Sequence, residues 1–259
     1  MVREFTSARG LHVTAGGAGD RLLVLLHGLG ANSSVWLSFI ALLEQRWEGR
    51  WLAPDFRGHG RSVYEGPYNF DTHAADIAAL IADEPTGSVT LLGHSFGGPV
   101  AALVASRPCA AQVRHVLAFG IKIDWTEAEI AKAREVATRP APDFSTRDEA
   151  IDRYLKISGL HGLVDPTSSE AISGVIKTAG GFRVAMDPAA YGAVGPSIED
   201  IFKRCRVPLR LAAGANDPMT SLAAMQRADP TAVLIENAAH SVHVEAPARL
   251  WGFVENAAI

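Results

Sequence analysis

The sequence has little cysteine and no long apolar run. Two of its 259 residues, Cys109 and Cys205, are cysteines, too few for a disulfide framework, so we expect two buried thiols in a reducing compartment. It has no run of about 18 apolar residues, so no segment is expected to span a membrane. The first ten residues lack the apolar run of a signal peptide, which makes the cytoplasm the expected location.

The sequence also lacks a block of basic residues. Its formal net charge is -4, and charges of both signs are scattered along the chain. This argues against a nucleic acid or an anionic membrane as partner and leaves a small molecule as the expected one. The common glycine-rich patterns for dinucleotides and nucleotide phosphates are absent as well. The oligomeric state stays open.

Apolar residues are abundant, at 48% of the chain, and the length suits one large α/β domain. Six runs are typical of strands buried in a parallel sheet. They are Arg21–His27, Gly49–Asp55, Ser88–Leu92, Val113–Phe119, Val207–Ala213 and Ala232–Glu236. Helical patterns lie between them, at Ser34–Gln45, Thr72–Ala82 and Phe96–Ser106. The alternation predicts an α/β fold with a mostly parallel central sheet of about eight strands, flanked by helices.

From Asp124 to about Pro196 the alternation stops. This segment has no convincing strand and is too long for a simple connection. It shows helical stretches at Thr126–Ala137, Thr146–Ser158 and Ser168–Lys177, followed by a passage rich in Gly and Pro. We therefore expect residues 124–196 to form a helical cap insertion, and residues 1–123 and 197–259 to form the core. The alternative is a few ordinary helices on the flank of the sheet.

The most specific motif is Gly93-His94-Ser95-Phe96-Gly97. It follows an apolar strand and opens a helix of small residues, which is the context that a G-x-S-x-G nucleophile turn requires. Glycines two positions either side of the serine prevent side-chain collisions in so tight a turn. The helix N-terminus directs amide hydrogens toward a developing oxyanion. Ser95 is therefore the predicted nucleophile; the alternative is a glycine-rich turn that holds a phosphate.

Four segments, in this order, resemble the α/β-hydrolase superfamily across nearly the whole chain. They read LHGLG from Leu26, DFRGHGRS from Asp55, GHSFGG from Gly93 and HSVHVEAP from His240. The resemblance implies a carboxylesterase-like serine hydrolase with a helical cap. It also implies catalytic residues in the order serine, acid, histidine.

A serine hydroxyl needs a base to attack at neutral pH, and the resemblance assigns that role to His240. His243 is the nearest rival, although a structural role suits it better. The acid that orients the imidazole is assigned to Asp217, after a late strand. Asp124, which follows an earlier strand closely, stays open as the alternative acid.

The resemblance also places the two backbone donors of an oxyanion hole at Leu29 and Phe96. His27, His59 and the Asp55–Ser62 turn are expected to be scaffold. Four further residues fall near strand ends or the cap entrance, where lining an acyl pocket and belonging to the core are equally open. They are Trp36, Phe39, Trp125 and Met219.

These assignments predict a two-step acyl transfer on a small to medium carboxylic ester, with no metal or organic cofactor. A serine nucleophile argues against haloalkane dehalogenase and epoxide hydrolase chemistry, where relatives use aspartate. Lactonases and C–C bond hydrolases share the fold and the triad, because fold does not fix function. A different class also stays open: a small-molecule receptor on a hydrolase fold that turns over very slowly.

Overall fold

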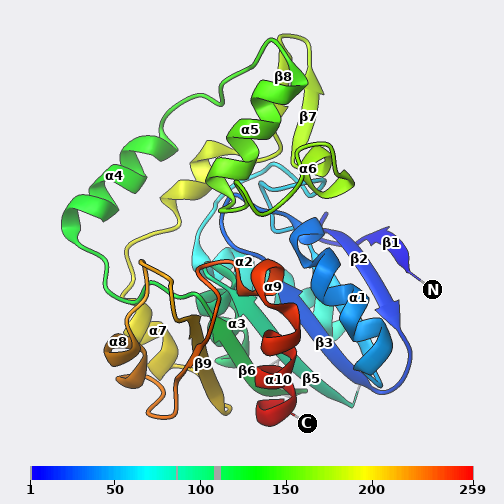
Figure 1. Ribbon diagram of the computed structural model, residues 1–259, viewed down its shortest axis with the longest axis vertical. Helices are drawn as coiled ribbons and strands as arrows, with labels where there is room; N and C mark the ends of the chain where they lie inside the picture. Colours follow the sequence, from blue (N-terminus) through cyan, green and yellow to red (C-terminus); the bar gives the residue numbers. More distant parts are fainter. Residues whose placement is uncertain (1, 86, 108–111, 259) are drawn as a thin grey trace.

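The computed structural model describes residues 2–85, 87–107 and 112–258. In this part of the chain, eight strands form one sheet in the order β1-β2-β4-β3-β5-β6-β9-β10 (Figure 1). The last six strands in this order, which are β4, β3, β5, β6, β9 and β10, run parallel. β2 pairs antiparallel with both β1 and β4. The predicted mostly parallel sheet of about eight strands is confirmed.

Six strands lie where the apolar runs predicted them. They are β3 (Arg21–Leu26), β4 (Arg50–Pro54), β5 (Ser88–His94), β6 (Val113–Phe119), β9 (Leu209–Gly214) and β10 (Val233–Ile235). Two strands were not located in advance, β1 (Arg3–Thr6) and β2 (His12–Gly17). β1 is a mostly exposed edge strand, so it has no need of an apolar run.

Helices cover both faces of the sheet (Figure 1). One face carries α2 (Phe70–Ala82), α3 (Gly97–Ala105) and α7 (Ile198–Lys203). The other carries η1 (Ser33–Trp36), α1 (Leu37–Arg46), α9 (Val242–Glu245) and α10 (Pro247–Ala258). The short α8 (Leu222–Gln226) follows β9. Within the described residues, no helix has the length and apolar character needed to cross a membrane.

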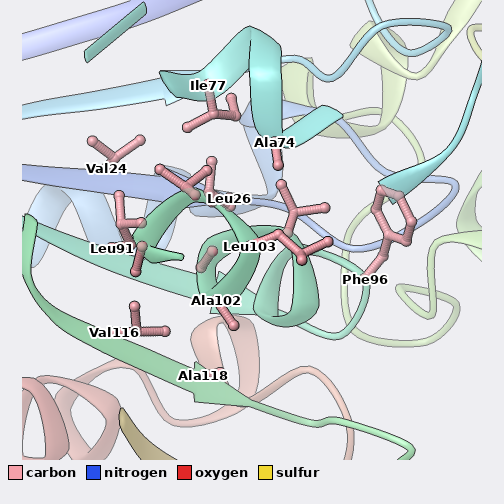
Figure 2. Packing of buried hydrophobic residues seen from close by; sticks show 14 of the residues in the cluster. Val24, Leu26, Ala74, Ile77, Leu91, Phe96, Ala102, Leu103, Val116 and Ala118 are labelled. Atoms are coloured by element: carbon pink, nitrogen blue, oxygen red, sulfur yellow. The ribbon is translucent and has the colours of Figure 1, made fainter. Parts of the chain in front are cut away.

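The core beneath α2 and α3 is made of aliphatic and small side chains. Figure 2 shows Ile77 of α2 and Leu103 of α3 in one cluster with Val24 of β3 and Leu91 of β5. Every residue of α3 is buried, which small side chains make possible. Burying a large aliphatic side chain contributes about 1.5–3 kcal/mol, so this layer fixes where the N-terminus of α3 lies.

Cysteine is represented in the described residues by Cys205, which has a free thiol. The thiol is partly buried rather than fully buried, and it donates to the Val207 carbonyl at 3.4 Å. Burial raises the pKa of this thiol, so it stays protonated at neutral pH. Cys109, the other predicted buried thiol, lies outside the described residues.

Residues 124–196 add no strand to the main sheet and lie together at one end of the molecule (Figure 1). They form α4 (Glu127–Ala137), α5 (Arg147–Ile157), α6 (Ser169–Ser173), β7 (Val175–Thr178), β8 (Gly181–Val184) and η2 (Pro188–Gly192). α4 and α5 each begin with a capping box, from Thr126 and Thr146 respectively. Both predicted helices therefore start where their sequence signals lie.

The prediction of a strand-free segment with a helix over Ser168–Lys177 is wrong. α6 ends at Ser173, and β7 and β8 pair antiparallel as a separate hairpin. Its first strand carries β-branched residues, and Gly181, with a φ of +132°, follows the two-residue connection at 179–180. Neither strand alternates regularly between buried and exposed residues, so the pattern that marks most strands is missing.

The polar contacts that join this segment to the core include two sets of hydrogen bonds. The Asp55–Ser62 turn meets residues 185–187: the Gly60 N–H donates to the Ala185 carbonyl, and the Asp187 N–H donates to the Gly58 carbonyl, each at 2.8 Å. The scaffold role predicted for this turn thus includes anchoring the segment above it.

The second set of contacts joins η1 to α6. The Asn32 amide donates to the Ser173 carbonyl at 3.2 Å, and the Ser173 and Ser34 hydroxyls are 2.7 Å apart. The neighbouring Tyr154 hydroxyl and Glu170 Oε1 are buried without a hydrogen-bond partner in the described part of the chain. A buried carboxyl oxygen without a partner opposes ionisation.

We predict that Glu170→Gln stabilises the protein more at alkaline than at acidic pH. Burial raises the pKa of Glu170 to about 7, from 4.5, so the native state holds the proton more tightly than the unfolded chain does. The carboxyl therefore costs stability increasingly as the pH rises through this window, and the amide removes that cost.

Thermal unfolding at about pH 4 and about pH 8 measures the effect, since these values lie on either side of the window. Glu170→Gln should gain little at the acidic value and clearly more at the alkaline one. Glu44→Gln, at an exposed position of α1, serves as the control and should show no such difference. An equal gain for Glu170→Gln at both values would contradict the prediction.

Candidate active site

Ser95 lies in the turn between β5 and α3, with a φ of +47°. Non-glycine residues rarely adopt this left-handed conformation, so the surrounding contacts must hold it. The Ser95 N–H donates to the Phe119 carbonyl at 2.9 Å, and the Ser95 carbonyl accepts from the Gly98 N–H at 3.0 Å. The side chain is partly exposed and lines a cavity.

The two glycines of the motif are required by space. A Cβ on Gly93 would lie 2.4 Å from the Gly97 carbonyl oxygen. A Cβ on Gly97 would lie 2.3 Å from the carbonyl oxygen of Leu26 in β3. Both contacts are with backbone, which cannot move aside without shifting the sheet. The turn is therefore as tight as its sequence predicts.

Asp217 and His240 come together from the loops after β9 and β10. His240 Nδ1 donates to Asp217 Oδ2 at 2.8 Å, and Asp217 Oδ1 accepts from the Met219 N–H at 2.9 Å. The Asp217 side chain is fully buried, whereas that of His240 is 19% exposed. The bond fixes the imidazole tautomer with the proton on Nδ1, which leaves Nε2 free to accept a proton.

His94 links the loop of His240 to the serine turn. Its Nε2 donates to the His240 carbonyl at 3.1 Å, and the two rings lie 4.8 Å apart. Among the described residues, no hydrogen bond joins the Ser95 hydroxyl to His240. Catalytic hydrogen bonds of this kind are often long until substrate is bound.

The two alternative catalytic residues lie elsewhere. His243 is buried between His94 and Trp36, with ring centroids at 4.5 and 4.8 Å, and burial lowers its pKa to about 3. Asp124 is exposed and forms an ion pair with Arg227 at 2.5 Å. Of the residues considered, the structure therefore pairs Asp217, not Asp124, with His240.

The two predicted oxyanion donors, the backbone N–H groups of Leu29 and Phe96, have no hydrogen-bond partner among the described residues. Leu29, Phe96 and Ser95 line the same cavity. Phe96 is also the N-cap of α3, so the positive end of that helix dipole adds to the field at the turn.

The loop that carries Leu29 is held by two neutral histidines. His27 Nε2 accepts from the Phe56 N–H at 2.9 Å, and His59 Nε2 accepts from the Gly30 N–H at 3.3 Å. Burial lowers the pKa of His27 to about 4 and that of His59 to about 3, so both rings stay uncharged and able to accept. The predicted scaffold roles match these contacts.

The cavity above Ser95 has a volume of about 330 Å³ and largely apolar walls. It is bounded below by the core and above by α4 and the loop at 193–196. Its one ion pair is between Lys122 and Glu129. In the described part of the chain, no group of three or more His, Cys, Asp or Glu side chains is arranged to hold a metal ion. The arrangement suits an apolar group attached to an electrophilic carbon beside Ser95.

Comparison with known proteins agrees with this geometry. The model of the alpha/beta hydrolase family matches residues 23–252, which is most of the chain. The chain belongs to this family. Its classification as a hydrolase and its predicted fold are thereby confirmed.

Proteins similar to this hydrolase include one named as a lipase, one named as a lactonase and a thioesterase domain. Lipase LipV of Mycobacterium tuberculosis is 33% identical to this chain over a matched region. That region covers 62% of this chain and 59% of the length of the lipase. The 3-oxoadipate enol-lactonase 2 of Acinetobacter baylyi is 26% identical over 82% of the chain and 77% of its own length. The thioesterase domain of the curacin biosynthetic pathway shares the fold over 99% of both chains, with a TM-score of 0.78 and 20% identity.

The four large residues left open by the sequence divide into two pairs. Trp36 and Phe39 are fully buried in the core of the hydrolase. Trp125 and Met219 line the cavity and are 42% and 46% exposed, so they stand at its mouth. Of the four residues, Trp125 and Met219 alone line the pocket, whereas Trp36 and Phe39 belong to the core.

Sequence reasoning missed the polar side of the hydrolase cavity. Lys122 and Glu129 lie on either side of the capping Thr126, whose side chain accepts from the Glu129 N–H at 3.2 Å. The Lys122 ammonium also lies 5.4 Å from the centre of the Trp125 ring. The capping box predicts the start of α4 from the sequence. That the first turn of α4 lines the same cavity as Ser95 depends on the tertiary fold, which the sequence does not display.

Proposed function

We propose that this α/β hydrolase cleaves small to medium carboxylic esters through an acyl-enzyme on Ser95. The observation that carries the proposal is the hydrogen bond between Asp217 and His240 beside the strained serine turn, whose Ser95 lines an apolar cavity. A buried carboxylate that orients an imidazole next to a serine is the arrangement that activates a hydroxyl for attack.

The first half of the reaction builds the acyl-enzyme. His240 Nε2 takes the Ser95 proton as the serine oxygen attacks the ester carbonyl. The Leu29 and Phe96 N–H groups stabilise the oxyanion, each contributing about 3 kcal/mol of barrier lowering. The protonated His240, whose charge Asp217 stabilises, then gives its proton to the departing alcohol.

The second half releases the acid. His240, neutral again, removes a proton from water, which attacks the acyl carbonyl on Ser95. The same two N–H groups hold the second oxyanion, and the serine oxygen leaves with the proton from His240. The products are a carboxylic acid and an alcohol, and the enzyme returns to its starting state.

We further propose that residues 124–196 act as a cap over the site. Supporting this, α4 and the loop at 193–196 form the upper wall of the cavity. With about 330 Å³ available, the cavity suits an acyl chain of short to medium length better than a long lipid chain. The core, residues 1–123 and 197–259, then supplies the chemistry and the cap sets the substrate size.

A panel of substrates tests the proposal. It contains p-nitrophenyl esters from acetate to hexadecanoate, simple lactones, amides and vinylogous diketones. We expect steady turnover of esters, highest for short to medium acyl chains. Lactones are the second candidate class, favoured by the similarity to the enol-lactonase. Turnover of the diketones alone would make the protein a C–C bond hydrolase, and a burst without turnover would make it a receptor.

A further inference from the structure

A second cavity, of about 440 Å³, lies entirely within residues 124–196. It is an open pocket lined by residues from the end of α4, the following loop, α5, β8 and η2, and it shares no lining residue with the cavity above Ser95. Its volume is within the range of small-molecule sites. The lining residues are Val136, Arg139, Pro140, Ala141, Pro142, Arg153, Ile157, Arg183, Val184, Met186, Pro188 and Tyr191.

The polar side chains of this lining are three arginines and a tyrosine. Two of the arginines already have carboxylate partners: Arg139 pairs with Glu135 at 2.5 Å, and Arg183 pairs with Asp143 at 2.9 Å. Arg153 forms no ion pair with any described residue. Arg153 is an exposed residue, so its guanidinium is compensated by solvent alone and is accessible to a ligand that enters this cavity.

The tyrosine adds a neutral donor beside that charge. Burial raises the pKa of Tyr191, although the positive charge of Arg153 works against the shift, so the hydroxyl keeps its proton at neutral pH. A guanidinium and a phenol together can donate to the two oxygens of one carboxylate. The other walls are prolines and aliphatic side chains, which favour an apolar body on the ligand.

We propose that this second cavity binds amphipathic monocarboxylates, with the carboxylate at Arg153 and Tyr191 and the apolar chain against Val136, Val184 and Met186. The single guanidinium compensated by solvent alone matches a monoanion rather than a dianion. Such carboxylates are also the acids that the proposed ester hydrolysis releases; this link, unlike the binding itself, rests on the proposed function.

The position of the cavity gives its occupant a route to the active site. Ile157 lines the cavity, and its carbonyl oxygen lies 3.0 Å from where a Cβ on Gly30 would be, next to the oxyanion donor Leu29. Two residues further on, the Gly159 carbonyl accepts from the Ser241 hydroxyl at 3.2 Å, beside His240. A ligand bound against α5 therefore contacts a segment that packs against the loop of Leu29 and is hydrogen-bonded to the loop of His240.

Octanoate binding, measured by calorimetry on the full chain, tests the proposal. Arg153→Gln should weaken binding about tenfold or more, which is the loss expected for a hydrogen-bonded charge. Lys156→Gln removes one positive charge from the same helix outside the cavity, where Lys156 pairs with Asp152 at 2.6 Å, and should leave the affinity unchanged. Octanol, which has the chain without the charge, should bind far more weakly than octanoate.

A crystal structure with octanoate locates the ligand. Density between Arg153 and Tyr191 supports the proposal. Density in the Ser95 cavity alone, an unchanged affinity in Arg153→Gln, or an equal loss in Lys156→Gln would each overturn it. None of these measurements needs turnover. The binding result can therefore be interpreted even if the protein proves to have no esterase activity.

Discussion

Replacing Ser95 with alanine is expected to lower ester turnover by about a million-fold while leaving the fold intact. The substitution removes the atom that forms the covalent bond, and the two backbone donors at Leu29 and Phe96 can then assist only the slow attack of water. Stability should change little, because the contacts that hold the turn are made by the Ser95 backbone and not by its hydroxyl.

The matched control is Ser38→Ala, at an exposed position of α1. It removes the same atom from a surface helix and should retain full turnover. Circular dichroism and thermal unfolding of both variants verify folding. Turnover of Ser95→Ala equal to that of Ser38→Ala would show that another residue attacks the substrate.

Replacing Asp217 with asparagine is expected to lower turnover by about ten thousand-fold. The carboxylate accepts from His240 Nδ1–H, but an amide nitrogen at that place would donate instead. The imidazole would then carry its proton on Nε2, the atom that must take the proton from Ser95. The amide also cannot stabilise the positive charge that develops on His240 during attack.

Asp124→Asn is the matched control for this variant. Asp124 is exposed, and its solvent-screened ion pair with Arg227 contributes little to stability. Its turnover should stay close to that of the wild type. A large loss in Asp124→Asn together with a small loss in Asp217→Asn would move the acid to the end of β6.

The sequence alone was enough to predict the serine turn, because the turn depends on local sterics. Gly93 is needed by the turn itself, since a Cβ there would strike the Gly97 carbonyl oxygen, whereas Gly97 is needed because the turn packs against Leu26 of β3. The buried strands were predictable for a similar reason: residues such as Val24 and Leu91 are covered on both sides, so their strands are continuously apolar.

The choice between Asp217 and Asp124 depended on sheet order, which the sequence does not display. Both aspartates follow parallel strands, so both lie at the same edge of the sheet. β9 lies between β6 and β10, and His240 follows β10, so the loop after β9 is the nearer one. Spatial adjacency of strands, not spacing along the chain, brings the acid to the histidine.

The hairpin and the two cavities were the least predictable features. β7 is exposed or half-buried throughout and β8 is half-buried except at Val184, so the regular burial that produces alternation in other strands is missing. The ion pair of Lys122 and Glu129 and the free guanidinium of Arg153 acquire meaning only from what the fold places around them. Charged side chains ordinarily face solvent, and nothing in the local sequence distinguishes these.

Trapping the acyl-enzyme tests the central claim most directly. The protein is incubated briefly with p-nitrophenyl butanoate, quenched in acid and digested, and the peptides are weighed by mass spectrometry. We predict a butanoyl mass increase on the peptide that contains Ser95, accumulating further in a variant whose deacylation is slowed, and absent from Ser95→Ala. A butanoyl group on any other residue, or full turnover by Ser95→Ala with no adduct, would contradict the account.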